Sequence, residues 1–289
     1  MKIGNHSYKY LVIMFFIVGA MYGQGPWAKG KGEGYAQLLF NIVPTYDELF
    51  DEDSPEGTIE TERELSDITI QSYIEYGLSD KLTVGGTIPF VFVSAGDQVN
   101  ENVTPRFAED NLGSLGNISF WGKYTLIDKK VKLAVISEFS LPTSTLNEAS
   151  GLATGVDAFS FQPKLSIGSS NSKFYYFGFF GYGLRNNDFN DFLNFGVEGG
   201  FNSSENLSFI LNISRLHNLG NGSSLVDSPA QISTGFYTSF QEYTSFSLKV
   251  FADKIYKDFG AFASLGGGGI RARSVAVSPA LGIGVFYKW

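Results

Sequence analysis

The sequence predicts an all-β protein: a transmembrane antiparallel up-and-down β-barrel of about 12 strands that follows an N-terminal signal peptide. Two observations predict this fold. Aromatic and β-branched residues recur in segments of about ten residues in which apolar and polar side chains alternate, as in a strand with one apolar face. The connections between these segments are short and long in turn, which is typical of bacterial outer-membrane barrels.

Residues 1–23 have the organisation of a secretory signal peptide. A weakly basic start is followed by an apolar run over residues 11–21 and then by small residues. The apolar run is shorter than the roughly 20 residues that a membrane-spanning helix needs. We therefore expect cleavage between Ala20 and Gln24, export to the outer membrane of a bacterial cell, and a barrel over residues 24–289.

The alternation assigns each strand one face for lipid and one for water. In Asn117–Leu126 one parity is apolar and includes Phe120, whereas the other is mainly polar and includes Lys123. The segments Ile68–Tyr76 and Phe159–Ile167 divide in the same way. Successive side chains of a strand point to opposite faces, so each segment has one apolar wall.

Clusters of Gly, Asn, Asp and Ser mark where each strand ends. In chain order, the expected strands are Gly34–Tyr46, Leu65–Gly77, Lys81–Ser94, Leu115–Leu126, Val131–Leu141, Ala158–Gly168, Lys173–Arg185, Phe192–Phe201, Asn206–His217, Gln231–Phe240, Tyr243–Ile255 and Val275–Trp289. Tight turns are expected at Leu78–Lys81, Ile127–Lys130, Ser169–Ser172, Asn202–Glu205 and Phe240–Tyr243. Long outside loops are expected near Asp47–Glu64, Ala95–Ser114, Pro142–Asp157, Asn186–Asp191, Asn218–Ala230 and Tyr256–Ser274.

The barrel must close, because an unpaired backbone group in hydrocarbon costs several kcal/mol. We expect the last strand, Pro279–Trp289, to pair with the first, Gly34–Tyr46. The C-terminal Trp289 resembles the aromatic signal that the barrel-assembly machinery recognises. Aromatic residues near strand ends are expected in the interfacial girdles, namely Tyr35, Tyr46, Tyr76, Phe90, Phe92 and Tyr124.

Two neighbouring segments carry a family resemblance. Ser72–Phe92 reads as a strand, a tight turn and a strand ending near Pro89, and Gly113–Lys130 opens with a strand framed by Gly113 and Gly116. This arrangement resembles the outer-membrane barrels of the meta-pathway phenol-degradation family and their transporter relatives.

The resemblance extends over most of the chain from about Gly32 onward. The segment Ser137–Ser144 resembles the proline-marked strand end that precedes a long loop in this family. The family usually has an acidic residue after the second glycine, where this chain has Asn117, so no role is carried over to that position. The resemblance implies passage of small, often hydrophobic molecules across the outer membrane.

The polar parity predicts which side chains line the lumen. Four basic candidates face four acidic ones, so strong selectivity for charge is not expected. The lumen-lining candidates are Glu75, Lys123, Lys132, Glu138, Lys164, Glu198, Lys249, Asp253, Tyr73, Trp121, Tyr237 and Phe251, with Phe286 a further inward aromatic. Two interpretations stay open: the charges form a structural network inside a narrow barrel, or they line a permeation path.

Composition excludes several kinds of site. The chain has no cysteine, which excludes disulfides and thiolate metal sites, and its net charge of −8 disfavours nucleic acid as a partner. The acidic loop Asp47–Glu62 could hold calcium, but it has no fixed ligand spacing, so a solvated loop is the simpler interpretation. The run Gly266–Gly269 lacks the arrangement of a phosphate loop. We expect no cofactor.

His-dependent catalysis in the mature chain could rest only on His217, because His6 lies in the signal peptide. Ser214 is three positions away, on the opposite face of the expected strand, so the two side chains cannot share a proton. We therefore expect no enzyme, with an outer-membrane hydrolase at His217 as an alternative.

The sequence thus predicts a passive channel or transporter for small, hydrophobic or aromatic solutes. The main alternative is a closed structural or ligand-binding barrel without transport. The expected partners are outer-membrane lipid, the barrel-assembly machinery through Trp289, and small-molecule solutes.

Overall fold

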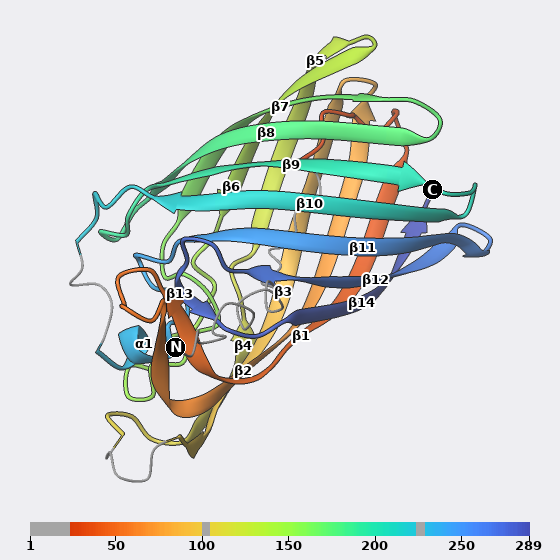
Figure 1. Ribbon diagram of the computed structural model, residues 1–289. Helices are drawn as coiled ribbons and strands as arrows, with labels where there is room; N and C mark the ends of the chain where they lie inside the picture. Colours follow the sequence, from red (N-terminus) through yellow and green to blue (C-terminus); the bar gives the residue numbers. More distant parts are fainter. Residues whose placement is uncertain (1–23, 100–104, 224–228) are drawn as a thin grey trace, which may run out of the picture.

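The computed structural model describes residues 24–99, 105–223 and 229–289, so the predicted signal peptide lies outside the described residues. Figure 1 shows a barrel with one short helix beside it. Its elements are β1 (Gly34–Asp51), β2 (Thr58–Ser79), β3 (Leu82–Gln98), β4 (Asp110–Leu115), β5 (Ser119–Asp128), β6 (Val131–Ser140), β7 (Ser160–Ser170), β8 (Phe174–Arg185), β9 (Phe192–Asn202), β10 (Leu207–Asn218), α1 (Pro229–Thr234), β11 (Tyr243–Tyr256), β12 (Phe259–Gly268), β13 (Arg273–Ala276) and β14 (Ala280–Lys288).

The strands form one antiparallel sheet that closes on itself. β1 pairs with β2 on one side and with β14 on the other, where the register runs from Tyr35 opposite Lys288 to Ile42 opposite Leu281. This confirms the predicted pairing of the first and last strands. The short strands β4 and β13 add to β3 and β1, so the wall itself has twelve strands, as predicted.

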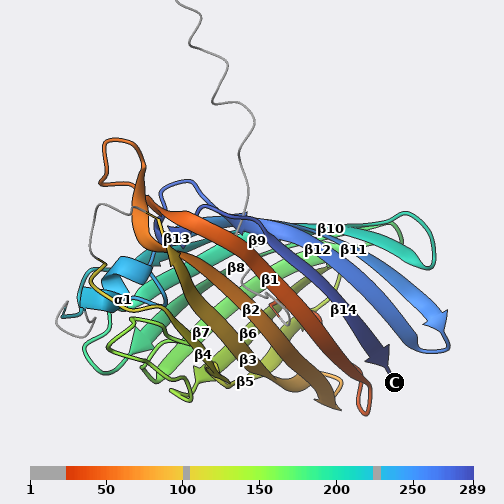
Figure 2. The same cartoon turned by 90° about the horizontal axis from the view of Figure 1, so that it is seen from below.

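The two ends of the barrel differ. Tight turns join β2 to β3, β5 to β6, β7 to β8, β9 to β10 and β11 to β12, and the C-terminus lies at this end, which we call the turn end. Helix α1 and the longer connections lie at the opposite end, the loop end (Figure 2). In outer-membrane barrels the short turns face the periplasm.

Exposure along the strands follows the predicted parity. Leu211 and Ile283 on the outer wall are 53% and 64% exposed, whereas Thr83 and Ser166 on the inner wall are fully buried. Among the aromatics expected at the lipid interface, Tyr76, Phe90, Phe92 and Tyr124 do lie on the outer wall. Tyr35 and Tyr46 do not, because their parity turns them into the barrel, where each is buried. In the part of the chain that is described, no helix has the length and apolar character to cross a membrane.

The strand expected over Gln231–Phe240 is wrong. Pro229 begins the helix α1, a position that suits its missing N–H group, and Gly235 follows the helix with a left-handed φ of 68°. The tight turn expected at Phe240–Tyr243 is wrong for the same reason, because the long connection that contains α1 runs on to the start of β11.

The strand β12 occupies part of Tyr256–Ser274, which we expected to be an outside loop. Its glycines and alanines gave it the composition of a loop, yet the glycines serve its packing. A Cβ at Gly260 would lie 2.2 Å from the ring of Phe286 on β14, so only glycine fits beneath that ring. The prediction thus omits β12 and includes one strand, Gln231–Phe240, that does not form. These two errors offset each other, so the predicted number of strands is correct.

Three other expected boundaries shift at the loop end. The last segment, Val275–Trp289, is divided into β13 and β14 by residues 277–279. Most of the expected loop Asp47–Glu64 belongs to β1 and β2, which continue outward as a long hairpin, and β4 lies within the expected loop Ala95–Ser114.

Apolar side chains fill the loop end of the barrel, and we call this group the outer cluster. Its buried members are Val43, Tyr46, Leu49, Leu65, Val91, Val93, Ala95, Phe107, Leu152, Ala153, Ala230, Phe236, Ala276 and Ala280. The connection with α1 is fixed there by a hydrogen bond of 2.8 Å from the Thr234 hydroxyl to the Gly151 carbonyl oxygen. The interior near the turn end remains for polar and aromatic side chains.

Candidate functional site

Six inward aromatic rings form a continuous arc along the inner wall, from β11 through β12, β14, β1 and β2 to β5. The members of this aromatic arc are Phe251, Phe262, Phe286, Tyr35, Tyr73 and Trp121. Neighbouring ring centroids lie 5.0 to 6.4 Å apart, the separation of stacked and edge-to-face pairs. The arc therefore offers an apolar, ring-lined surface inside the barrel.

Glycines on neighbouring strands let these rings lie against the wall. A Cβ at Gly85 on β3 would lie 2.4 Å from the ring of Trp121, and one at Gly284 would lie 2.4 Å from the ring of Phe262. The rings thus cover backbone that has no side chain of its own, as in aromatic rescue of glycine. This pairing explains part of the high glycine and aromatic content of the sequence.

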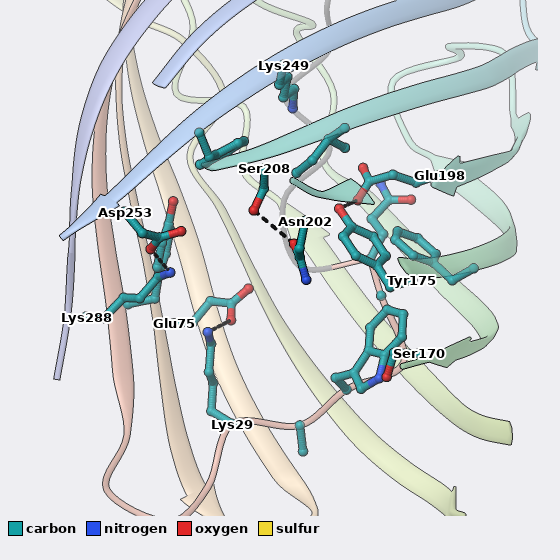
Figure 3. A pocket seen from close by; sticks show the side chains of 18 of the residues that line it. Lys29, Glu75, Ser170, Tyr175, Glu198, Asn202, Ser208, Lys249, Asp253 and Lys288 are labelled. Atoms are coloured by element: carbon teal, nitrogen blue, oxygen red, sulfur yellow. Dashed lines mark hydrogen bonds and ion pairs between the residues drawn. The ribbon is translucent and has the colours of Figure 1, made fainter. Parts of the chain in front are cut away.

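Ion pairs and charge-assisted hydrogen bonds surround the arc toward the turn end. The Lys29 ammonium lies 3.6 Å from the Glu75 carboxylate, which also accepts a hydrogen bond from the Tyr73 hydroxyl. Lys288 on β14 forms an ion pair with Asp253 on β11 (Figure 3). These carboxylates are neutralised by partners within the barrel, as buried charges require.

The carboxylate of Glu198 lies on the opposite wall and is held by hydrogen bonds. It accepts one of 2.8 Å from the Tyr175 hydroxyl and one of 3.3 Å from the Asn212 amide. The positive charge of Lys249 acts on this carboxylate, and Figure 3 shows both residues around the same hollow.

Three ammonium groups lie over faces of the aromatic arc. Lys29 is 5.2 Å from the Tyr35 ring centroid and Lys288 is 5.0 Å from that of Phe286. The ammonium of Lys123 is 5.3 Å from the centroid of Trp121, on the same strand. Cations at this distance are attracted by the negative ring face. The rim of the arc toward the turn end thus holds ammonium groups as well as the carboxylates of Glu75 and Asp253.

Residues 24–33 enter the turn end of the barrel and form what we call the N-terminal strap. The Trp27 ring meets the rings of Tyr175 and Phe177 edge-on, at 5.6 and 5.7 Å between centroids. The Thr125 hydroxyl donates to the Pro26 carbonyl oxygen at 3.2 Å. The Lys29 amide donates to a threonine hydroxyl on β3 at 2.8 Å. The strap therefore narrows the turn end.

Residues of the strap, the arc and the opposite wall line a partly open cavity of about 530 Å³. Seven of the predicted lumen residues line it, namely Tyr73, Glu75, Lys123, Glu198, Lys249, Phe251 and Asp253. Figure 3 shows side chains from the strap, β8, β9, β10, β11 and β14 around this hollow.

The other predicted lumen residues lie elsewhere. Trp121 belongs to the aromatic arc, and Lys164 and Glu138 form their own pair at 2.7 Å between β7 and β6. Lys132 pairs with Asp128 beside a tight turn. Tyr237 is not on a strand, and it packs against the outer cluster with a left-handed φ of 49°. Its expected position depended on the false strand over Gln231–Phe240.

Several cavity residues were missed in the sequence. Tyr35 has the inward parity of β1, so the same alternation that gave Tyr73 could have identified it. Tyr175 and Lys288 lie near strand ends, where parity is hard to assign. Trp27 and Lys29 lie before the first strand, and no local pattern indicates that they fold back into the barrel.

His217 lies on the outer face of β10 and not in the cavity. Its Nδ1 atom is 2.9 Å from the Glu242 carboxylate, which also pairs with Arg215. Ser214 faces inward, where its hydroxyl lies 2.6 Å from that of Ser245. The structure thus places the serine and the histidine on opposite faces, as the spacing indicates.

The acidic segment Asp47–Glu62 is the tip of the β1–β2 hairpin. Asp53 pairs with Arg273 at the start of β13, and Glu62 pairs with Arg106 in the connection between β3 and β4, so two of its carboxylates bind neighbouring segments at the loop end. In the described ranges, no three His, Asp or Glu side chains come together in a way that could hold a metal ion.

Asp191 organises the connection between β8 and β9 at the loop end. Burial opposes ionisation of its carboxyl group, but hydrogen bonds from Asn221, the Arg185 amide and Tyr182, with the charge of Arg185, outweigh it. The net effect lowers the pKa of Asp191 below its usual value. The ionised form therefore favours the folded loop.

Two solved outer-membrane proteins, a channel and a porin, have a similar fold. An outer-membrane channel from Pseudomonas putida F1 is 13% identical, with a TM-score of 0.64 over 94% of this chain and 100% of that one. The NanC porin is 6% identical, with a TM-score of 0.51 over 88% of this chain and 100% of that one. At these identities the likeness establishes the fold alone, and a search of curated protein sequences gives no match.

A family model described as "Putative MetA-pathway of phenol degradation" matches residues 50–283. The match covers most of the barrel, from the tip of the β1–β2 hairpin to the middle of β14. The match agrees with the family resemblance of the segments Ser72–Phe92 and Gly113–Lys130, and with the closed barrel of the structure. The chain therefore belongs to this family of outer-membrane β-barrels.

Proposed function

We propose that this protein is a passive channel of the bacterial outer membrane for small solutes that contain rings. The observation that carries the proposal is the cavity of about 530 Å³ inside a closed barrel, whose wall combines aromatic rings with charged groups. An apolar outer wall suits lipid, and an amphipathic inner surface suits solutes that have both an apolar and a polar part.

The dimensions favour small solutes. A barrel of twelve strands encloses more space than one of eight, which side chains nearly fill, and less than a porin of 16 or more. The strap and the outer cluster narrow the interior further at its two ends. Passage would require the strap, the outer cluster or both to move, so we expect a low conductance.

The remaining assignments follow from this proposal. We propose export by a cleaved signal peptide, lipid contact through the outer apolar parity, and recognition of Trp289 by the barrel-assembly machinery. We propose no enzymatic activity. His217 faces outward and pairs with Glu242, an arrangement suited to fixing the end of β10.

One observation favours a second candidate, a binding barrel without transport. The outer cluster packs fourteen buried residues at the loop end, which would close that end if the connection with α1 does not move. A solute could then enter the cavity only past the strap.

Liposome swelling with purified protein separates the two candidates. A graded series of sugars, amino acids and aromatic acids is added to vesicles that contain the protein, and swelling is followed by light scattering. Uptake that falls with solute size and is retained for one-ring acids supports a channel. No swelling with any solute would favour the closed binding barrel.

A further inference from the structure

We propose that a second, smaller cavity at the loop end binds an organic ammonium ion, with the ammonium on the carboxylate of Asp67 and the hydrocarbon part among tyrosine rings. This site is separate from the cavity near the turn end, so the inference goes beyond the proposed channel. It comes from the position of one acidic side chain in a hollow beside the outer cluster.

The smaller cavity has a volume of about 200 Å³ and lies between the barrel wall and the connection with α1. Residues of β1, β2 and β13 line it on the wall side, and residues between α1 and the start of β11 line it on the other. Its lining includes five members of the outer cluster, namely Val43, Tyr46, Leu49, Phe236 and Ala276. An apolar cavity of about 150 Å³ in a protein core can hold benzene, so this one has room for a solute with one ring.

Asp67 brings a negative charge into this cavity. It has the inward parity of β2 and lies opposite Val43 of β1. In the part of the chain that the structure describes, its carboxylate accepts one side-chain hydrogen bond, of 3.0 Å from the Thr69 hydroxyl, and forms no ion pair. Arg185 stacks on the Phe192 ring, 4.3 Å from its centroid, and does not line the cavity.

No basic side chain of the protein is placed to neutralise this carboxylate. Every Lys, Arg and His from residue 24 onward lies within the described ranges, and none of them lines the cavity. A charge inside a protein needs a partner of opposite sign or further hydrogen bonds. An ammonium group of a solute supplies both, because it carries one positive charge and donates hydrogen bonds to carboxylate oxygens.

Three tyrosines, Tyr46, Tyr237 and Tyr243, line the cavity with Asp67. Tyr237 lies close enough to Asp67 and to both other tyrosines to interact electrostatically with each of them. The faces of tyrosine rings attract cations, and their hydroxyl oxygens accept hydrogen bonds. One carboxylate among rings suits an organic ammonium ion, whereas calcium or magnesium prefers six or more oxygen ligands.

The backbone of the lining indicates that the rings are held in place. Tyr237 and Ser274 have left-handed φ values of 49° and 53°, which are unfavourable for residues that carry a Cβ. The Gln241 side chain donates to the Ser274 carbonyl oxygen at 3.0 Å and joins the two sides of the cavity. Strained residues concentrate at ligand sites, where the surrounding structure maintains them. The site is therefore organised before a ligand enters.

Benzylammonium and benzyl alcohol have nearly the same shape and differ in charge, so together they test the site. The full mature chain is purified in detergent, and each compound is titrated into it at constant ionic strength by isothermal titration calorimetry. We expect benzylammonium to bind at least about tenfold more tightly than benzyl alcohol, because only the ammonium pairs with Asp67.

Variants assign the binding to this cavity. Asp67→Asn keeps the size of the side chain and should weaken benzylammonium binding at least about tenfold, with less than about a threefold change for benzyl alcohol. Tyr237→Leu removes one ring and should weaken benzylammonium binding about threefold or more. The matched control is Asp110→Asn at the same end, where the carboxylate accepts a hydrogen bond of 2.8 Å from the Asn147 amide outside the cavity. The control should leave the affinity within about twofold.

Equal affinities of the unmodified protein for benzylammonium and benzyl alcohol would overturn the proposal, and this comparison needs no variant. Equal losses for Asp67→Asn and Asp110→Asn would also overturn it. Glu198→Gln reports on the larger cavity, and a loss there without a loss for Asp67→Asn would place the ammonium at the wrong end. Heat-modified gel migration verifies that each variant is folded.

Liposome swelling separates this site from the channel. Binding of benzylammonium that depends on Asp67, without swelling by any solute, keeps the site and refutes the channel. Swelling without a preference for benzylammonium over benzyl alcohol in the titration keeps the channel and refutes the site.

Discussion

The aromatic contacts of the N-terminal strap predict that Trp27→Ala opens the turn end of the barrel. The ring makes two edge-on contacts, with Tyr175 and Phe177, and each such contact contributes about 0.5–1.5 kcal/mol beyond the area that it buries. With the lost burial of a half-buried ring included, we expect docking of the strap to weaken by about 2–3 kcal/mol. The ratio of docked to undocked strap then falls roughly 30- to 150-fold.

Single-channel recording in planar bilayers measures the consequence. The unmodified protein should show a small conductance, and Trp27→Ala should show a larger mean conductance with more frequent open intervals. Tyr256→Ala is the control, because it removes an aromatic ring that is 65% exposed near the same end but outside the cavity. If Trp27→Ala and Tyr256→Ala both conduct like the unmodified protein, the strap does not obstruct the path and the reasoning fails.

Three further predictions concern stability. Gly260→Val should destabilise the barrel by about 1–3 kcal/mol, since its Cβ would overlap the Phe286 ring, and a lower urea midpoint would reveal this. Ile283→Arg places a charge on the outer wall in the middle of β14 and should lower the free energy of unfolding in lipid vesicles by about 2–4 kcal/mol. An unchanged free energy of unfolding would show that this wall is not in contact with lipid. Asp191 stabilises the fold above its unfolded pKa of about 4, and this contribution is lost as pH falls through the lower folded value. Asp191→Asn should therefore show a smaller drop in urea midpoint between pH 5 and 3 than the unmodified protein, and equal drops would count against the assigned hydrogen bonds.

The alternation of side chains allowed much of the wall to be predicted from sequence. Successive side chains of a strand point to opposite faces, so a strand with lipid on one side and water on the other alternates apolar and polar residues. Glu75, Lys123 and Lys249 could therefore be assigned to the interior without knowing their partners. Seven predicted residues do line one cavity, because strands that are distant in sequence bring the same parity to a common centre. The closure of β14 on β1 followed from the cost of an open edge in hydrocarbon.

The parts that could not be predicted depend on tertiary contacts. Whether a glycine-rich segment forms a loop or a strand depends on the aromatic ring that covers it. For Gly260 on β12 that ring belongs to Phe286 on β14, which is distant in sequence, so local sequence does not reveal the contact. The segment around α1 alternates like a strand, but it packs its apolar residues into the outer cluster. Trp27 gives no local sign of entering the barrel, since its partners lie on β8.

The most direct test of the account measures which parity meets lipid and which meets the interior. The chain has no cysteine, so single cysteines can be placed at Ser208, Phe209, Ile210 and Leu211 of β10 and labelled with a nitroxide. In vesicles, collision with oxygen should be high at positions 209 and 211, and collision with a water-soluble nickel complex should be higher at 208 and 210, which line the cavity. Accessibility without this alternation, or with the two reagents reversed, would contradict a closed barrel with lipid outside and a solute path within.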